Sequence, residues 1–335
     1  MTPRPPEDSA AQQRQAEAKL TAHRGMATLG ERLVPLDRYR QATAAAGRRL
    51  SAADRLTARQ RFLAPADDPT PVEGPFGRIA IFGGVYSNHL ALAALLADAQ
   101  RRGAEAIYCL GDLGGFGPNP DKVWPLLERG GVLGVQGNYE ESLAGGRDDC
   151  NCGYTDPRDN HFAEISYRYT AERTSAQLKG WMGSLPRRRR VRVGARELLL
   201  VHGSPRRNNE FLFHSTSPIP FLEHLLDQER SAGVLCSHTG LHWHRRLPSG
   251  RDVVNVGVIG RPANDGDTAV WYAMLEDRNQ TLGVELLRLP YDHRSLADEM
   301  RRELLPQEFV DSILTGWWTT CLEILPARER ASSRY

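Results

Sequence analysis

A buried strand that ends in an aspartate constrains the fold most. It lies in residues 107–120, which read IYCLGDLGGFGPNP. Apolar residues run directly into Gly111 and Asp112, and a loop rich in glycine and proline follows. The pattern predicts a carboxylate at the carboxyl end of a strand, the edge of an α/β sheet where ligands bind. Because many strands end in aspartate for turn chemistry, this residue is informative only if other strand ends carry similar groups.

The residues before this stretch predict a β-α-β unit. Residues 78–82 are typical of a buried strand, and apolar side chains at helical spacing follow between residues 90 and 99. Two strands joined by a helix within about thirty residues should be parallel. Further along we expect a hairpin at 191–201, strands at 132–136 and 234–236, and antiparallel strands at 253–258 and 269–275.

Three further strand ends carry polar side chains. Asn138, His202 and His238 each come shortly after an apolar run. With Asp112 they supply a carboxylate, an amide oxygen and two imidazoles, which suit a divalent transition metal such as Mn, Fe or Zn. Singly, a histidine after a strand is more often a hydrogen-bonded structural residue, and an asparagine is often a turn residue. Jointly, the four residues favour a metal site.

Composition restricts the classes of function. The 335 residues are 40% hydrophobic and 25% charged with a net charge of +2, which is typical of a soluble globular protein and predicts no membrane or nucleic-acid partner. Transmembrane and signal-peptide patterns are missing from the sequence. The five cysteines argue against a disulfide framework. We therefore expect a cytoplasmic protein.

Three regions are expected along the chain. Residues 1–75 are polar and rich in Pro, Ala and Arg, and predict a partly disordered, partly helical arm with a linker. Residues 76–280 hold the strand-end motifs and form the compact domain. Residues 281–335 are expected to form a helical extension that packs on it. The arm or the C-terminal helices could join copies of the chain into a homo-oligomer.

Five motifs resemble those of the calcineurin-like metallophosphoesterases, in particular the bacterial phosphodiesterase-like branch. They are residues 111–118 (GDLGGFGP), 137–140 (GNYE), 201–205 (VHGSP), 237–239 (SHT) and 255–262 (NVGVIGRP). They occur in the family's order and cover roughly residues 78–276. The resemblance implies an α/β (α+β) fold, a β-sandwich flanked by helices, with a two-metal site at the strand ends. The helical arm and the C-terminal helices would be additions.

The departures from the family pattern concentrate at one metal. The family's Asp-x-His-Gly-Asn motif corresponds to residues 84–88 (GVYSN), so that Gly84 replaces the Asp and Tyr86 the His. The family's Gly-His-Thr-His motif ends here in Gly240. The resemblance implies that these three missing side chains would bind the first metal.

The second metal keeps its full ligand set. The resemblance assigns to it the bridging Asp112 together with Asn138, His202 and His238. We therefore expect a reduced site with about one tightly bound divalent metal per chain.

Other side chains could refill the first-metal position. The candidates are Asp148, Asp149, Cys150, Cys152, Asp159, His161, His242 and His244. The Cys150-x-Cys152 spacing is too short for the usual zinc knuckle, so we favour a free-thiol loop. His242 lies two residues beyond Gly240, and two residues of a strand span about 6.6 Å. His242 would therefore stand too far away to replace the missing ligand directly, and we expect it to be an outer-shell or substrate group. Tyr86 could point its phenol into the cavity or fill it.

Three residues are candidate catalytic groups. Tyr139 stands where the family frequently has an acid/base histidine. Arg206 follows the His202 motif and could offset negative charge on a phosphoryl group. Asn88 ends the first motif.

An arginine-rich run at residues 187–192 needs a separate interpretation. We favour a solvated strand edge that blocks aggregation. The alternative is nucleic-acid contact, and no aromatic stacking pattern accompanies the run to support it.

The leading hypothesis is a metal-dependent phosphoesterase-like hydrolase with a small phosphorylated substrate, either a phosphomonoester or a phosphodiester. One alternative is a non-hydrolytic pseudoenzyme that binds a nucleotide or phosphorylated ligand. Another is a redox or other metal-dependent enzyme on the same fold, in which Cys150 and Cys152 take part. The loops that would line the site match no substrate-recognition motif.

Overall fold

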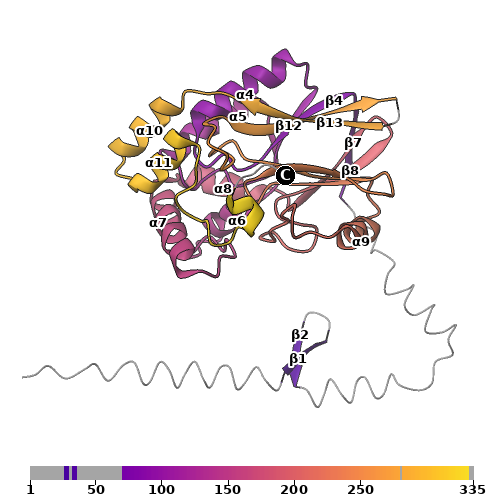
Figure 1. Ribbon diagram of the computed structural model, residues 1–335, viewed down its shortest axis with the longest axis horizontal. Coiled ribbons are helices and arrows are strands. Elements are labelled where there is room, and N and C mark those ends of the chain that lie inside the picture. Colours follow the sequence, from indigo (N-terminus) through magenta and orange to yellow (C-terminus); the bar gives the residue numbers. More distant parts are fainter. Residues whose placement is uncertain (1–25, 30–31, 36–69, 280, 332–335) are drawn as a thin grey trace, which may run out of the picture. The chain divides into compact units, whose positions relative to one another are not determined.

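The computed structural model describes residues 26–29, 32–35, 70–279 and 281–331 (Figure 1). The chain divides into two compact units, Met1–Ala64 and Pro65–Tyr335. In the first unit, β1 (Met26–Leu29) and β2 (Arg32–Pro35) form an antiparallel hairpin. The rest of the expected helical arm lies outside the described residues.

The second unit contains a five-stranded sheet in the order β13-β12-β4-β5-β6. Its strands are β4 (Arg78–Phe82), β5 (Ala106–Cys109), β6 (Leu133–Gly134), β12 (Val270–Arg278) and β13 (Thr281–Leu289). β4 and β5 are parallel and are joined by α4 (His89–Arg101), which confirms the predicted β-α-β unit. β12 runs antiparallel to β4 and to β13.

A six-stranded sheet has the order β10-β11-β9-β8-β7-β3. Its strands are β3 (Val72–Phe76), β7 (Arg188–Val193), β8 (Arg196–Val201), β9 (Gly233–Cys236), β10 (His242–Arg246) and β11 (Asp252–Val256). The predicted hairpin is confirmed as β7 and β8. The strand predicted at 253–258 corresponds to β11. It is antiparallel to β10, as expected, but it is parallel to its other neighbour, β9.

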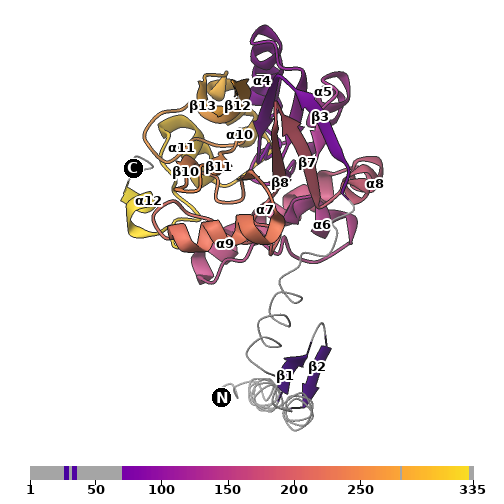
Figure 2. The ribbon, with the colours of Figure 1, turned by 90° about the vertical axis from the view of Figure 1, so that its right-hand side faces the viewer.

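The arginine-rich run is not a sheet edge, and that interpretation was wrong. β3 pairs in parallel with β7, so β7 lies inside the sheet (Figure 2). Several of its arginines pair with carboxylates: Arg189 lies 2.5 Å from Glu73, and Arg188 lies 2.9 Å from Glu229. The expected linker therefore ends earlier than predicted, because Val72 already belongs to a strand.

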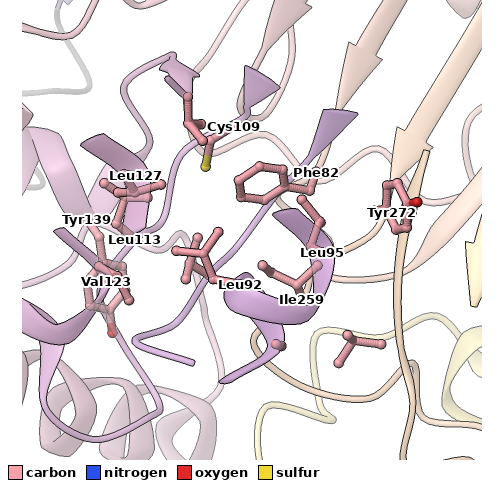
Figure 3. Close-up of a cluster of buried hydrophobic side chains, with 14 of the residues drawn as sticks. Phe82, Leu92, Leu95, Cys109, Leu113, Val123, Leu127, Tyr139, Ile259 and Tyr272 are labelled. Carbon is pink, nitrogen blue, oxygen red and sulfur yellow. The ribbon is translucent and has the colours of Figure 1, made fainter. Parts of the chain in front are cut away.

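The core is layered between and outside the two sheets. Ile81, Tyr108 and Leu200 belong to the cluster that joins the two sheets. On the outer face of the five-stranded sheet, Leu92 and Leu95 of α4 pack near Phe82 and Tyr272, as Figure 3 shows. On the other outer face, α9 (Ile219–Glu229) buries its leucines against β9. This sandwich flanked by helices agrees with the predicted fold class.

Further helices surround the ends of the strands. They are α5 (Trp124–Arg129), preceded by the 3-10 turn η1 (Pro120–Val123), α6 (Asn138–Ala144), α7 (Pro157–Arg173) and α8 (Ala176–Ser184). In the described part of the chain, no helix is long and apolar enough to cross a membrane.

The C-terminal region starts with a strand and continues as helices. β13 occupies the start of the expected helical extension, because it completes the sheet beside β12. The helices are α10 (His293–Arg302), α11 (Gln307–Thr315) and α12 (Ala327–Ala331). Phe309 of α11 packs with Phe116 and Phe162, so α11 lies beside α7 and the loop after β5 (Figure 1).

Candidate metal centre

Asp112 stands in the loop after β5, and a buried glutamate holds this loop in place. Gly111 and Asp112 both have left-handed backbone conformations, with φ of 86° and 57°. The Glu140 carboxylate accepts the backbone N–H groups of Asp112 and Leu113, at 2.8 and 2.7 Å, and also that of Gly137. Burial and the charge of Asp112 raise the pKa of Glu140, while the N–H donors act against this rise. Glu140 thus fixes both the Asp112 loop and the start of α6, a role that the sequence analysis missed.

Asn138 begins α6, and its side-chain oxygen is directed by a loop carbonyl. Its Nδ2 donates to the carbonyl oxygen of Cys150 at 2.9 Å. Its Oδ1 therefore faces the other way and lies 2.9 Å from Nε2 of His202.

His202 follows β8, and His238 follows β9, which lies beside β8. Nδ1 of His202 donates to the carbonyl oxygen of Leu110 at 2.6 Å, and Nε2 of His238 donates to that of Cys152 at 3.1 Å. Because a carbonyl can only accept, the remaining nitrogens, Nε2 of His202 and Nδ1 of His238, present lone pairs when the rings are neutral. These two atoms lie 2.9 Å apart.

The four predicted ligands converge with their acceptor atoms turned inward. Nε2 of His202 also lies 3.3 Å from Oδ2 of Asp112, and all four side chains are buried. The ligand atoms of Asp112, His202 and His238 all lie within 4.8 Å of one another. Two ligands at right angles around an ion lie about 3 Å apart when each bond is about 2.1 Å. The donor types and their separations therefore fit one transition-metal ion.

Electrostatics in this cluster point the same way. Burial opposes charge on His202, but Asp112 raises the pKa of His202 above its usual value. Burial also acts against charge on Asp112, yet His202 lowers the pKa of that carboxyl. Burial and the neighbouring His202 lower the pKa of His238 to about 3. The cluster thus attracts one positive charge, and it favours that charge near Nε2 of His202.

The structure places the three candidate catalytic residues differently. Tyr139 lines the pocket beside Asp112, and its hydroxyl lies 2.9 Å from Oγ of Ser166. Asn88 caps α4 by accepting the Ala91 N–H and donates to the Ile259 carbonyl. Arg206 is paired with Glu210 and stacks over Phe221, outside the residues that line this pocket. Of the three, only Tyr139 lines this pocket.

Cys150 and Cys152 are joined in a disulfide, so the predicted free-thiol loop was wrong. The general argument against disulfides failed for this pair because the loop brings the two cysteines together over a two-residue separation. The carbonyls that hold Asn138 and His238 belong to this disulfide-bonded segment.

The remaining candidates do not refill the first-metal position in the described residues. Asp159 accepts backbone N–H groups of Glu323 and Ile324, and His244 pairs with Asp252 at 2.8 Å. His242 stacks on Trp271 with ring centres 3.9 Å apart. Among the described His, Cys, Asp and Glu side chains, the only cluster suited to a metal is Asp112, His202 and His238.

Bulky groups now occupy the surroundings of the missing ligands. A Cβ atom added at Gly84 would lie 2.4 Å from Cγ1 of Val258 and 2.8 Å from Cζ of Tyr86. A Cβ added at Gly240 would lie 3.2 Å from the Trp318 ring. The aligned glycines therefore cannot regain metal-binding side chains unless their neighbours move.

A pocket of about 50 Å³ adjoins the centre. Its wall includes Asp112, His238, Tyr86, Tyr139 and Arg261. Arg261 belongs to the last of the five motifs, and the sequence alone predicted no role for it. The sequence did offer one indication of a role at the site, because Arg261 follows a predicted strand within one of the five motifs.

Comparison with known proteins agrees with this architecture. Residues 78–279 match the model of the calcineurin-like phosphoesterase superfamily domain, which is more than half of the chain. The protein belongs to the calcineurin-like phosphoesterase superfamily, and its function is phosphoesterase-like.

Individual relatives cover the same part of the chain. The uncharacterized protein MJ0912 of Methanocaldococcus jannaschii is 23% identical over 255 residues, which span 71% of this chain and 98% of that protein. The crystal structure of hypothetical protein PH1004 from Pyrococcus horikoshii OT3 has a TM-score of 0.61 at 21% identity, covering 72% and 99%. The crystal structure of a metallophosphoesterase from Sphaerobacter thermophilus has a TM-score of 0.56 at 25% identity, covering 71% and 98%.

Proposed function

We propose that the protein is a phosphoesterase that hydrolyses a small phosphomonoester or phosphodiester and uses one divalent transition metal. Asp112, Asn138, His202 and His238 would hold the ion. The observation that carries this proposal is the inward orientation of four acceptor atoms, because three of these side chains have another atom bound to a backbone carbonyl. Such carbonyl contacts orient metal ligands in many proteins.

The bound ion would supply Lewis acidity to a phosphoryl oxygen and lower the pKa of a bound water. The chain itself contributes position and hydrogen bonds. Glu140 fixes the Asp112 loop. Burial raises the pKa of Tyr139 far above its usual value, so its phenol stays neutral and can donate a hydrogen bond to an ester oxygen.

One alternative has a specific observation in its favour. The missing first-metal ligands favour a pseudoenzyme that binds a phosphorylated ligand without hydrolysing it, because two ions normally clamp the attacking and leaving oxygens. The other alternative, a redox or other metal-dependent enzyme on the same fold in which Cys150 and Cys152 take part, stays a prediction; in the structure the two residues form a disulfide.

Activity assays on metal-loaded protein separate the two functions. Protein reconstituted with Mn²⁺, Fe²⁺ or Zn²⁺ would be tested on aryl phosphomonoesters and phosphodiesters. We expect hydrolysis with one of these ions and its loss in Asp112→Asn and His202→Ala. His224→Ala is the matched control, since this exposed histidine lies on α9, which packs on the outer face of the six-stranded sheet. Phosphate binding without hydrolysis of any ester would support the pseudoenzyme.

A further inference from the structure

The Arg261 guanidinium lies beside the positions that lack first-metal ligands. Its Nη2 lies 3.6 Å from the point where a Cβ of residue 240 would stand. Its Cζ lies 5.8 Å from the centre of the Tyr86 ring. Gly240 and Tyr86 are two of the three residues at which this chain departs from the ligand pattern. The positively charged Arg261 side chain therefore stands close to the position where the ligands of the first metal ion are missing.

Arg261 is held in place by aromatic rings. Its Cζ lies 3.4 Å from the centre of the Trp318 ring and 5.8 Å from that of Phe116. Trp318 is fixed in turn, because its Nε1 donates to the Pro262 carbonyl at 2.6 Å and its backbone N–H donates to Asn264. These contacts orient the guanidinium and supply cation–π attraction, but they bring no negative charge.

No anion of the described chain neutralises Arg261. The residue is 7% exposed, and its Nε has no hydrogen-bond partner. Within residues 70–279 and 281–331, no carboxylate forms an ion pair with it. Burial raises the pKa of the Tyr86 phenol and of the nearby Cys321 thiol, so both stay neutral. A buried cation without a counter-ion is costly, and a bound anion would remove that cost.

The guanidinium shares its pocket with the metal centre. Arg261, Asp112 and His238 all line the cavity of about 50 Å³. A water-sized group needs roughly 10–15 Å³ on this measure, so the cavity holds a few such groups. This is the scale of one phosphate group. A guanidinium matches such an anion with two parallel N–H donors.

We propose that Arg261 takes the place of the family's first metal as the cation that binds the substrate's phosphoryl oxygens. This inference rests on the proposed function for the identity of the anion. The site then combines one metal ion and one arginine, both facing one phosphoryl group. It favours substrates whose phosphoryl group carries two free oxygens on the side of Arg261.

Phosphate binding tests the assignment without requiring turnover. The dissociation constant of inorganic phosphate is measured by calorimetry on metal-loaded wild-type protein, Arg261→Met and Arg261→Lys, together with metal content. We expect Arg261→Met to weaken phosphate binding about 10- to 100-fold, because a charge-assisted bidentate pair is lost. Arg261→Lys should be intermediate, since it keeps the charge but not the fork. Metal content should stay near one per chain.

The matched control is Arg173→Met. Arg173 also lies over an aromatic ring, that of Tyr169 at 5.4 Å, but it is paired with Glu303. The Arg173→Met variant should bind phosphate as the wild type does. If Arg261→Met does not fold, Arg261→Gln carries the test, because it also removes the charge, and an unchanged dissociation constant in that variant overturns the proposal.

The outcomes separate this inference from the proposed function. Hydrolysis by the wild type, with unchanged phosphate affinity in Arg261→Met, overturns the role of Arg261 and leaves the phosphoesterase standing. Phosphate binding that depends on Arg261, without hydrolysis of any ester, supports the role of Arg261 and contradicts the hydrolase. A metal-loaded wild-type protein that binds no phosphate overturns the inference outright.

Discussion

Nε2 of His202 and Nδ1 of His238 lie 2.9 Å apart, while the second nitrogen of each ring donates to a backbone carbonyl. In neutral rings this arrangement places two lone pairs face to face. Only a shared proton or a metal ion makes such an approach favourable. The nearby oxygens of Asn138 and Asp112 add two more acceptors. Four acceptor atoms at such short distances favour a bound metal ion at this position.

Removing either imidazole should therefore abolish tight metal binding. We expect His202→Ala and His238→Ala to weaken metal affinity by at least about 100-fold, since loss of an outer-shell partner alone costs about 10- to 100-fold. Competition with a chromophoric chelator measures this, with His224→Ala as the control. Wild-type affinity in His238→Ala would show that His238 is a structural residue.

The disulfide-bonded segment should support the metal ligands. Replacing Cys150 and Cys152 by serine frees the segment whose carbonyls orient Asn138 and His238. We expect metal affinity to fall about 10-fold, the range for lost outer-shell support. Reductant should have the same effect on the wild type and no further effect on the double variant. Equal affinity in the untreated wild type, the reduced wild type and the double variant would contradict this role.

Glu140 should contribute mainly to stability. Its carboxylate accepts three backbone N–H groups in a buried site, and Glu140→Gln leaves at least one of them without its acceptor. We expect the free energy of unfolding to fall by about 1–3 kcal/mol. The control is Glu141→Gln, because the adjacent Glu141 pairs with the largely exposed Arg147 and Arg187 and should change stability by less than about 1 kcal/mol. Denaturant titration of the wild type and of both variants measures these changes in the free energy of unfolding. An equal loss in Glu140→Gln and Glu141→Gln would contradict the role of Glu140.

The first 69 residues should not be needed for the metal site. A chain that begins at Thr70 keeps β3 and all four proposed ligands, so we expect it to fold and to bind metal as the full chain does. Circular dichroism and metal analysis test this. A folded but metal-free product would mean that the N-terminal region completes the site.

Sequence reasoning reached the fold and the four converging residues because both depend on local patterns. Asp112, His202 and His238 each follow an apolar strand, and strand ends in one domain meet at a common edge. The pairing of β3 with β7 was not predictable in this way, because it joins residues far apart in the chain.

The surroundings of the site were harder to predict for the same reason. Arg261 and Trp318 meet only in the folded chain, and nothing in either local sequence signals that contact. Arg206 follows His202 closely in sequence, yet its own pairing with Glu210 directs it elsewhere. Spacing along the chain places a residue near a site but does not determine which way its side chain points.

The metal content of purified protein tests the central claim most directly. The full chain would be reconstituted with Mn²⁺, Fe²⁺ or Zn²⁺, desalted and analysed by elemental mass spectrometry against protein concentration. The account predicts close to one tightly bound ion per chain, and close to none in His202→Ala. Close to two ions per wild-type chain would contradict it, since Gly84, Tyr86 and Gly240 would then not have cost the protein its first metal.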